Sequence, residues 1–119
     1  MNINFKIKGT DISDATRAYA QEKAQTLVKF MGVDSNTARM DIEFSDDPKH
    51  VSGEVYRVDM VAIAPGLDMH TVGHGETMNA AIDMARDDMA RRLSRSKDKH
   101  RSLLRKGSRA IKKMLRMSS

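Results

Sequence analysis

Cationic side chains gather at the C-terminal end of this 119-residue chain. Residues 86–119 hold 13 Lys and Arg against 3 Asp, a net charge of +10. Residues 1–85 hold 8 basic and 13 acidic side chains, a net charge of −5. Ammonium and guanidinium groups at this density pair with phosphates, so the sequence predicts a polyanionic partner. The expected arrangement is a small domain that places its last helix and its tail on nucleic acid.

A helix that begins at Thr77 would position the first of these cations. Its buried stripe has the three- and four-residue spacing of Met78, Ile82, Ala85, Met89 and Leu93. With that stripe inward, Arg91 and Arg95 project together, and Arg86 and Lys97 lie on another flank. Such a ridge neutralises phosphates without reading base sequence. A merely solvated helix face is the alternative, but solvated faces normally mix both signs of charge.

The remaining elements predict an α+β domain. Apolar residues alternate over 2–8, 37–45 and 56–62, which is typical of strands with one buried face, and a less regular strand is expected over 67–74. A helix capped by Ser13 should run to Gly32. The order β-α-β-β-β-α favours a mainly antiparallel four-stranded sheet with both helices packed on one face and water on the other. Residues 1–99 should form this domain, and residues 100–119 a basic tail that is disordered when free.

Composition narrows the class of protein further. Without cysteine, the chain can form neither a disulfide framework nor a thiolate metal site. The N-terminus lacks the apolar run of a signal peptide, and no segment reaches the roughly 20 apolar residues of a membrane span. The sequence therefore predicts a cytoplasmic protein.

Metal binding and catalysis are not expected. His70 and His74 would share one face of a helix, as metal ligands do, but Gly73 and Gly75 indicate a strand, on which they would lie about 13 Å apart. We therefore predict no metal and no other cofactor. No nucleophile has a suitable context, and no acid–base arrangement is seen among Asp46, Asp47, Glu54 and Asp59. The protein is predicted not to be an enzyme.

Two segments carry a resemblance to a known family. The run MNAAID at 78–83, followed by MARRLSRSKDK at 89–99, resembles the terminal helix of the ribosome hibernation-promoting factor and protein Y family. The first helix fits the same family at Ile12, Ser13, Arg17, Lys23 and Leu27, so the resemblance covers roughly residues 1–101. It implies a fold related to double-stranded RNA-binding domains and a short-form member of the family.

The resemblance also implies a function. Members of this family sit in the decoding region of the small ribosomal subunit and block messenger and transfer RNA during stress or stationary phase. The partners would be the small subunit and its 16S-type rRNA, with no membrane and no small-molecule substrate, and the free protein would be a monomer. The family's rRNA contacts fall on Arg91, Arg95, Lys97, Lys99 and Arg101, and less firmly on Lys23. Arg86, from the charge pattern, completes the predicted RNA-binding set.

Two departures from the family pattern and one alternative function remain. Asn79 stands where many members have tyrosine, and Asp88 stands where relatives are often basic, which weakens the local positive charge. The alternative is a module that uses its amphipathic tail on an anionic membrane or an acidic partner. Leucines at 103 and 104 and the apolar residues Ile111, Met114 and Leu115 favour it, whereas Gly107 and the lack of Trp or Phe in the tail argue against it.

Overall fold

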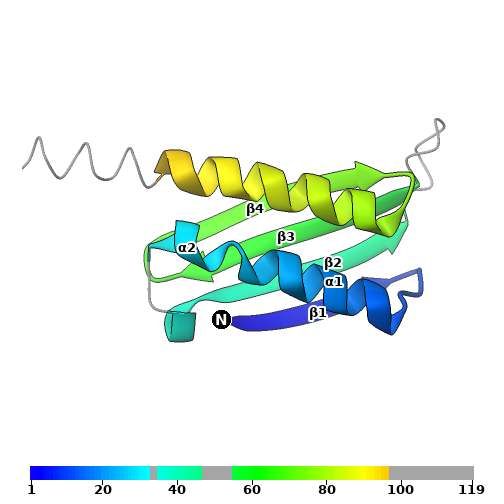
Figure 1. The fold of residues 1–119 in the computed structure, drawn as a ribbon, viewed down its shortest axis with the longest axis horizontal. Coiled ribbons are helices and arrows are strands. Elements are labelled where there is room, and N and C mark those ends of the chain that lie inside the picture. Colours follow the sequence, from blue (N-terminus) through cyan, green and yellow to red (C-terminus); the bar gives the residue numbers. More distant parts are fainter. Residues whose placement is uncertain (33–34, 47–54, 97–119) are drawn as a thin grey trace, which may run out of the picture.

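Four strands form one mixed sheet in the order β1-β2-β3-β4 (Figure 1). The computed structural model describes residues 1–32, 35–46 and 55–96. The strands are β1 (Asn2–Lys8), β2 (Arg39–Asp46), β3 (Tyr56–Ala64) and β4 (Leu67–Gly75). β1 runs parallel to β2, because a helical crossover joins them, and the other neighbours are antiparallel. The predicted α+β order is confirmed.

The first helical segment differs from its prediction. Ser13 caps α1 (Asp14–Gln25), accepting from the backbone amide of Thr16 at 3.1 Å, as expected. The single helix predicted up to Gly32 is wrong, because a separate short helix, α2 (Val28–Met31), follows a break. At the break, the Thr26 hydroxyl donates to the carbonyl of Lys23 at 2.6 Å. The amides of Thr26 and Leu27 bond to carbonyls three residues back, which tightens the turn and interrupts the α-helical ladder.

The C-terminal helix occupies residues 78–96 of the described chain. The hydroxyl of Thr77 accepts from the amide of Ala80 at 3.1 Å, so Thr77 is the predicted cap. Figure 1 shows this helix, in yellow-green, and α1 on the same side of the sheet, with α1 over β1 and β2 and the C-terminal helix beside β4. The prediction of two helices on one face is confirmed.

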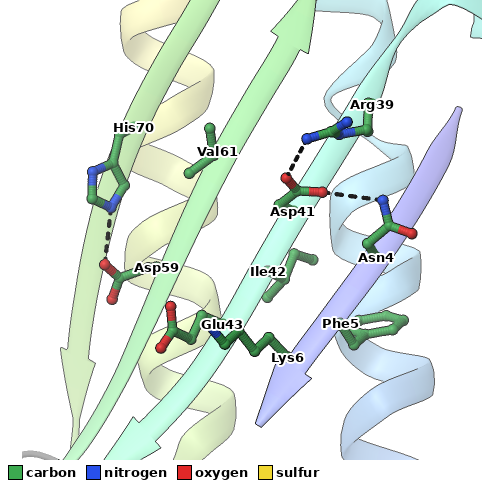
Figure 2. A pocket seen from close by; sticks show the side chains of 10 residues that line it. All are labelled: Asn4, Phe5, Lys6, Arg39, Asp41, Ile42, Glu43, Asp59, Val61 and His70. Carbon is green, nitrogen blue, oxygen red and sulfur yellow. Dashed lines mark hydrogen bonds and ion pairs between the residues drawn. The ribbon is translucent and has the colours of Figure 1, made fainter. Parts of the chain in front are cut away.

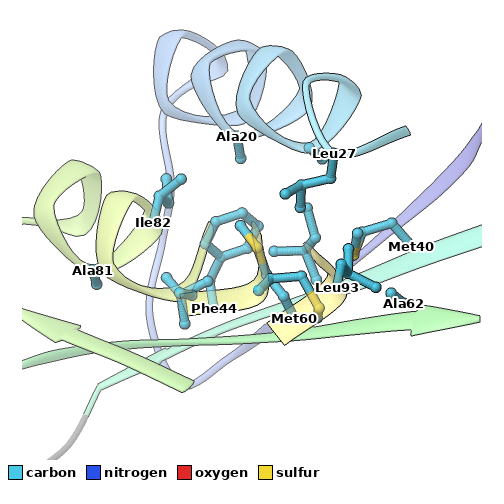
Figure 3. Packing of buried hydrophobic residues seen from close by; sticks show 14 of the residues in the cluster. Ala20, Leu27, Met40, Phe44, Met60, Ala62, Ala81, Ile82 and Leu93 are labelled. Atoms are coloured by element: carbon cyan, nitrogen blue, oxygen red, sulfur yellow. The ribbon is translucent and has the colours of Figure 1, made fainter. Parts of the chain in front are cut away.

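The core lies between this helical layer and the sheet (Figure 3). Alternate residues of β2 and β3 point into it, and so does the predicted stripe of the C-terminal helix from Met78 to Leu93. Five methionines are buried there, as their spacing predicts: Met31, Met40, Met60, Met78 and Met89. This packing fixes which face of each helix remains in water.

β4 and the C-terminal helix approach each other unusually closely. Thr71 is buried and donates its hydroxyl proton to the carbonyl of Ala85 at 2.8 Å. A Cβ at Gly73 would overlap the carbonyl oxygen of Ala81, and one at Gly75 would lie 2.7 Å from its amide nitrogen. Only glycine fits at these positions. The contact sets the rotation of the helix and therefore the direction of its arginines.

Candidate nucleic-acid interface

Three arginines lie on the second half of the C-terminal helix, and we call them the arginine cluster: Arg91, Arg92 and Arg95. All three are exposed, because Met89 and Leu93 turn the apolar stripe of the helix into the core. Among residues 89–96 there is no carboxylate, so this stretch has three positive charges and no negative one. Arginine presents a planar fork of donors that matches two phosphate oxygens. The cluster is thus suited to a nucleic-acid backbone.

The cluster lies on the β4 side of the helix. The sulfur of Met84 accepts a hydrogen bond from the backbone amide of His74 at 3.4 Å, so this flank of the helix contacts β4. Arg91 and Arg95 follow Met84 by seven and eleven residues, which places them on the same flank. The structure therefore brings Arg91 and Arg95 together, as their helical phase predicts. Arg92 was not among the residues predicted for RNA binding, although it directly follows Arg91.

Asp88 neutralises part of the arginine cluster. Its carboxylate lies 3.2 Å from Arg92 and 3.7 Å from Arg91, measured between side-chain oxygen and nitrogen. The three residues have the i, i+3 and i, i+4 spacing at which helical side chains meet. Arg95 makes no ion pair within residues 1–32, 35–46 and 55–96. The weaker positive charge expected near Asp88 is thus explained by its ion pairs with Arg91 and Arg92.

Arg86 points away from the cluster, toward α1. Its Nε donates to the hydroxyl of Thr26 at 2.9 Å, and its Nη1 lies 3.1 Å from the carboxylate of Asp87. Only 21% of its side chain is exposed. The predicted RNA-binding residue therefore joins the break after α1 to the C-terminal helix. In this position its Nε and Nη1 are already hydrogen-bonded within the protein.

Lys23 is also engaged between the two helices. Its ammonium lies 3.9 Å from Asp83 and 5.4 Å from the centre of the Tyr19 ring. The hydroxyl of Tyr19 donates to Asp83 at 2.6 Å. This hydrogen bond, together with burial and the negative charge of Asp83, raises the pKa of Tyr19 to about 12. Lys23 and Arg86 thus share a self-neutralised seam, apart from the arginine cluster.

Three predicted contacts cannot be placed. Lys97, Lys99 and Arg101 lie outside the described residues, as does the whole of the predicted tail. Of the seven predicted RNA-binding residues, the described structure contains Lys23, Arg86, Arg91 and Arg95.

The open face of the sheet is balanced in charge. The strand register puts four cationic side chains on it, from Lys6, Lys8, Arg39 and Arg57. It also puts there four anionic ones, from Asp41, Glu43, Asp59 and Asp68. A depression of about 540 Å³ on this face is lined by both signs (Figure 2). Because the two signs of charge are equal in number, this face does not favour binding of a polyanion.

One network on the open face was missed at the level of sequence. Asp59 accepts a hydrogen bond from Arg57 at 2.8 Å. It also lies 2.9 Å from Nε2 of His70, on the neighbouring strand, and Figure 2 shows this second contact. Burial alone would raise the pKa of Asp59, but the hydrogen bonds from Arg57 and His70 outweigh it and hold that pKa below its usual value. Arg57 lies two residues away on the same strand, whereas the position of His70 becomes visible only through the register, which pairs Asp59 with Val72 and Val61 with His70.

His70 and His74 both lie on β4, so the predicted strand is confirmed for these two residues. In the described parts of the chain, no group of three or more His, Cys, Asp or Glu is arranged to hold a metal ion. Within the same residues, no helix is long and apolar enough to cross a membrane.

Comparison with known proteins agrees with this architecture. A family model described as Sigma 54 modulation protein / S30EA ribosomal protein matches residues 3–101. A comparison with curated proteins gives no significant match.

Two solved structures share the fold. The N-terminal domain of Thermus thermophilus protein Y aligns with a TM-score of 0.65 at 23% identity, over 80% of this chain and 98% of that one. A ribosomal subunit interface protein from Coxiella burnetii aligns with a TM-score of 0.65 at 20% identity, over 82% of this chain and 99% of that one. At these identities the likeness establishes the fold alone.

Proposed function

We propose that this chain, which belongs to the Sigma 54 modulation protein / S30EA ribosomal protein family, is a ribosome-binding translation inhibitor. It docks in the decoding region of the small subunit, contacts 16S-type rRNA, and blocks messenger and transfer RNA during stress or stationary phase. The observation that carries this proposal is the arginine cluster on a domain of that family, whose open sheet face is balanced in charge.

The binding step follows from the chemistry of the cluster. Exposed guanidinium groups pair with phosphate oxygens and release the counterions that surround RNA, which gives strong binding that weakens with salt. Lys97, Lys99 and Arg101 continue the positive run along the sequence. We assign them the same role. Contacts of this kind fix position on folded RNA without reading its sequence.

Inhibition then requires no chemical step. A domain seated in the decoding region competes with messenger and transfer RNA for the same space, so occupancy alone stops initiation. The protein accordingly acts as a stoichiometric inhibitor and not as an enzyme. The ratio of protein to ribosomes, rather than time, should set the extent of inhibition.

The proposal is tested by in vitro translation combined with sedimentation. Added protein should stop synthesis as its amount approaches that of the ribosomes, and it should travel with the small subunit in a low-salt gradient. Anionic vesicles in a parallel experiment test the alternative use of the basic tail on a membrane. Untouched synthesis at a stoichiometric excess, with the protein migrating free of ribosomes, would refute the proposal.

A further inference from the structure

Asp88 lies beside the arginine cluster and forms ion pairs with two of its members. It is the carboxylate that contacts two of the three arginines, at 3.2 Å to Arg92 and 3.7 Å to Arg91. Its side chain is 29% exposed, whereas those of Arg91 and Arg92 are 65% and 53% exposed. The carboxylate is thus the more enclosed partner, and the two guanidinium groups extend past it into water.

We infer that Asp88 is an internal competitor for RNA phosphates and thereby sets the affinity of the interface and the salt range over which it binds. This inference rests on the proposed function of the arginine cluster. In the free protein, Asp88 takes the place that a phosphate would occupy beside Arg91 and Arg92. On docking, each guanidinium exchanges a carboxylate oxygen for a phosphate oxygen, and the Asp88 charge remains beside the RNA.

Two costs follow from this exchange. The ion pairs with Asp88 must be broken or shared, although pairs of this exposed kind are individually weak. The remaining carboxylate also repels the phosphates that bind its former partners, since like charges a few ångströms apart disfavour each other. Both costs are electrostatic, so both should shrink as salt is added.

The neighbouring residue provides a matched control. Asp87 has the same charge and lies in the same turn, but its carboxylate pairs with Arg86 at 3.1 Å. Arg86 is held toward α1 by its hydrogen bond to Thr26. Removing the charge of Asp87 therefore changes the net charge of the helix equally and releases no member of the arginine cluster.

The test compares Asp88→Asn and Asp87→Asn in the full chain. Equilibrium binding is measured to purified small subunits and, separately, to a short RNA duplex, over a series of salt concentrations. Asp88→Asn should bind both roughly three- to tenfold more tightly than the unchanged protein at low salt, since one repulsive charge is lost and two weak ion pairs are released. Asp87→Asn should change affinity less than about twofold. Unfolding midpoints of both variants check that the fold is kept.

A double-mutant cycle ties the effect to the arginines. In a background with Arg91→Gln and Arg92→Gln, the added change Asp88→Asn should have less than about a twofold effect. Wild-type affinity of Asp88→Asn for the duplex and the subunit would overturn the inference, as would an equal gain from Asp87→Asn or a full gain in the double-arginine background. If no variant binds the subunit, the proposed function is refuted, and the duplex measurements still decide the role of Asp88.

Discussion

The hydroxyl of Tyr19 donates a 2.6 Å hydrogen bond to Asp83, joining α1 to the C-terminal helix across 64 positions of the sequence. Lys23 and Arg86 are held in the same seam, at Asp83 and at Thr26. The helical layer therefore has two electrostatic halves. One is internally neutralised and fixes the two helices together, and the other is the arginine cluster, which faces away from α1.

The first prediction concerns the ionisation of Tyr19. Because its pKa in the folded protein is raised from 10.0 to about 12, the neutral phenol stabilises the fold at pH values below 10, and that contribution is lost as the pH rises through about 12. In a Tyr56→Phe variant, which leaves Tyr19 as the last tyrosine, ultraviolet difference absorbance should show ionisation near pH 12. Changing Asp83 to Asn should lower that midpoint, and an unchanged midpoint would show that Asp83 is not the cause.

The second prediction concerns the contact of β4 with the C-terminal helix. Gly73→Ala should lower the free energy of unfolding by about 2 kcal/mol or more, because its Cβ would overlap the carbonyl of Ala81 and force the helix outward. Val72→Ala, on the open face of the same strand, should cost less than about 1 kcal/mol. Urea unfolding measures both. Equal stability of the two variants would contradict the close packing seen here.

The third prediction concerns the end of the domain. Truncation after Lys99 should leave a cooperatively folded protein, because the buried stripe of the C-terminal helix has its last described member at Leu93. The shortened protein should keep its unfolding temperature and lose affinity for ribosomes. Loss of cooperative unfolding in calorimetry would mean that apolar residues of the tail, such as Leu103 or Ile111, belong to the core.

The fourth prediction uses the network on the open face. The folded-state pKa of Asp59 is lowered from 3.8, so its ion pairs stabilise the protein above that pH, and the contribution is lost as the pH falls through the folded-state value. Asp59→Asn should therefore flatten the acid side of the stability profile below about pH 4. Asp68→Asn, on the same face, serves as the matched control. If the free energy of unfolding of Asp59→Asn still falls steeply below about pH 4, other carboxylates are responsible for the loss of stability.

Local patterns were sufficient for most of the fold. Alternation placed the strands within a few residues, and the caps at Ser13 and Thr77 were readable because capping depends on neighbours three residues away. The break after α1 was not readable in this way. The apolar spacing continues through Leu27 and Met31 across the break, so periodicity alone predicts one continuous helix. The hydroxyl of Thr26 at the break also accepts a hydrogen bond from Arg86, 60 positions later, a partner that only the folded chain supplies.

In the candidate site too, the features that depend on neighbouring residues were predicted, and those that depend on tertiary packing were not. Helical phase correctly grouped Arg91 with Arg95 and put Arg86 on another flank, since phase is a local property. It could not show that Arg86 and Lys23 are engaged by α1 and by Asp83, because those partners are brought together only by packing. Arg92 was missed for a related reason. Its phase lies nearer the buried stripe, and its exposure is a property of the assembled layers.

The salt dependence of binding to the small subunit is the most direct test of whether the arginine cluster binds rRNA phosphates. Changing Arg91 and Arg95 together to Ala should reduce the slope of log affinity against log salt by about 2, from a wild-type value of about −5, because two of roughly six phosphate contacts are lost. The paired change of Lys6 and Lys8 to Ala removes the same charge from the open face of the sheet and should leave the slope unchanged. Wild-type affinity and slope in the arginine variant would contradict binding by the arginine cluster, and the interface would then lie elsewhere on the protein.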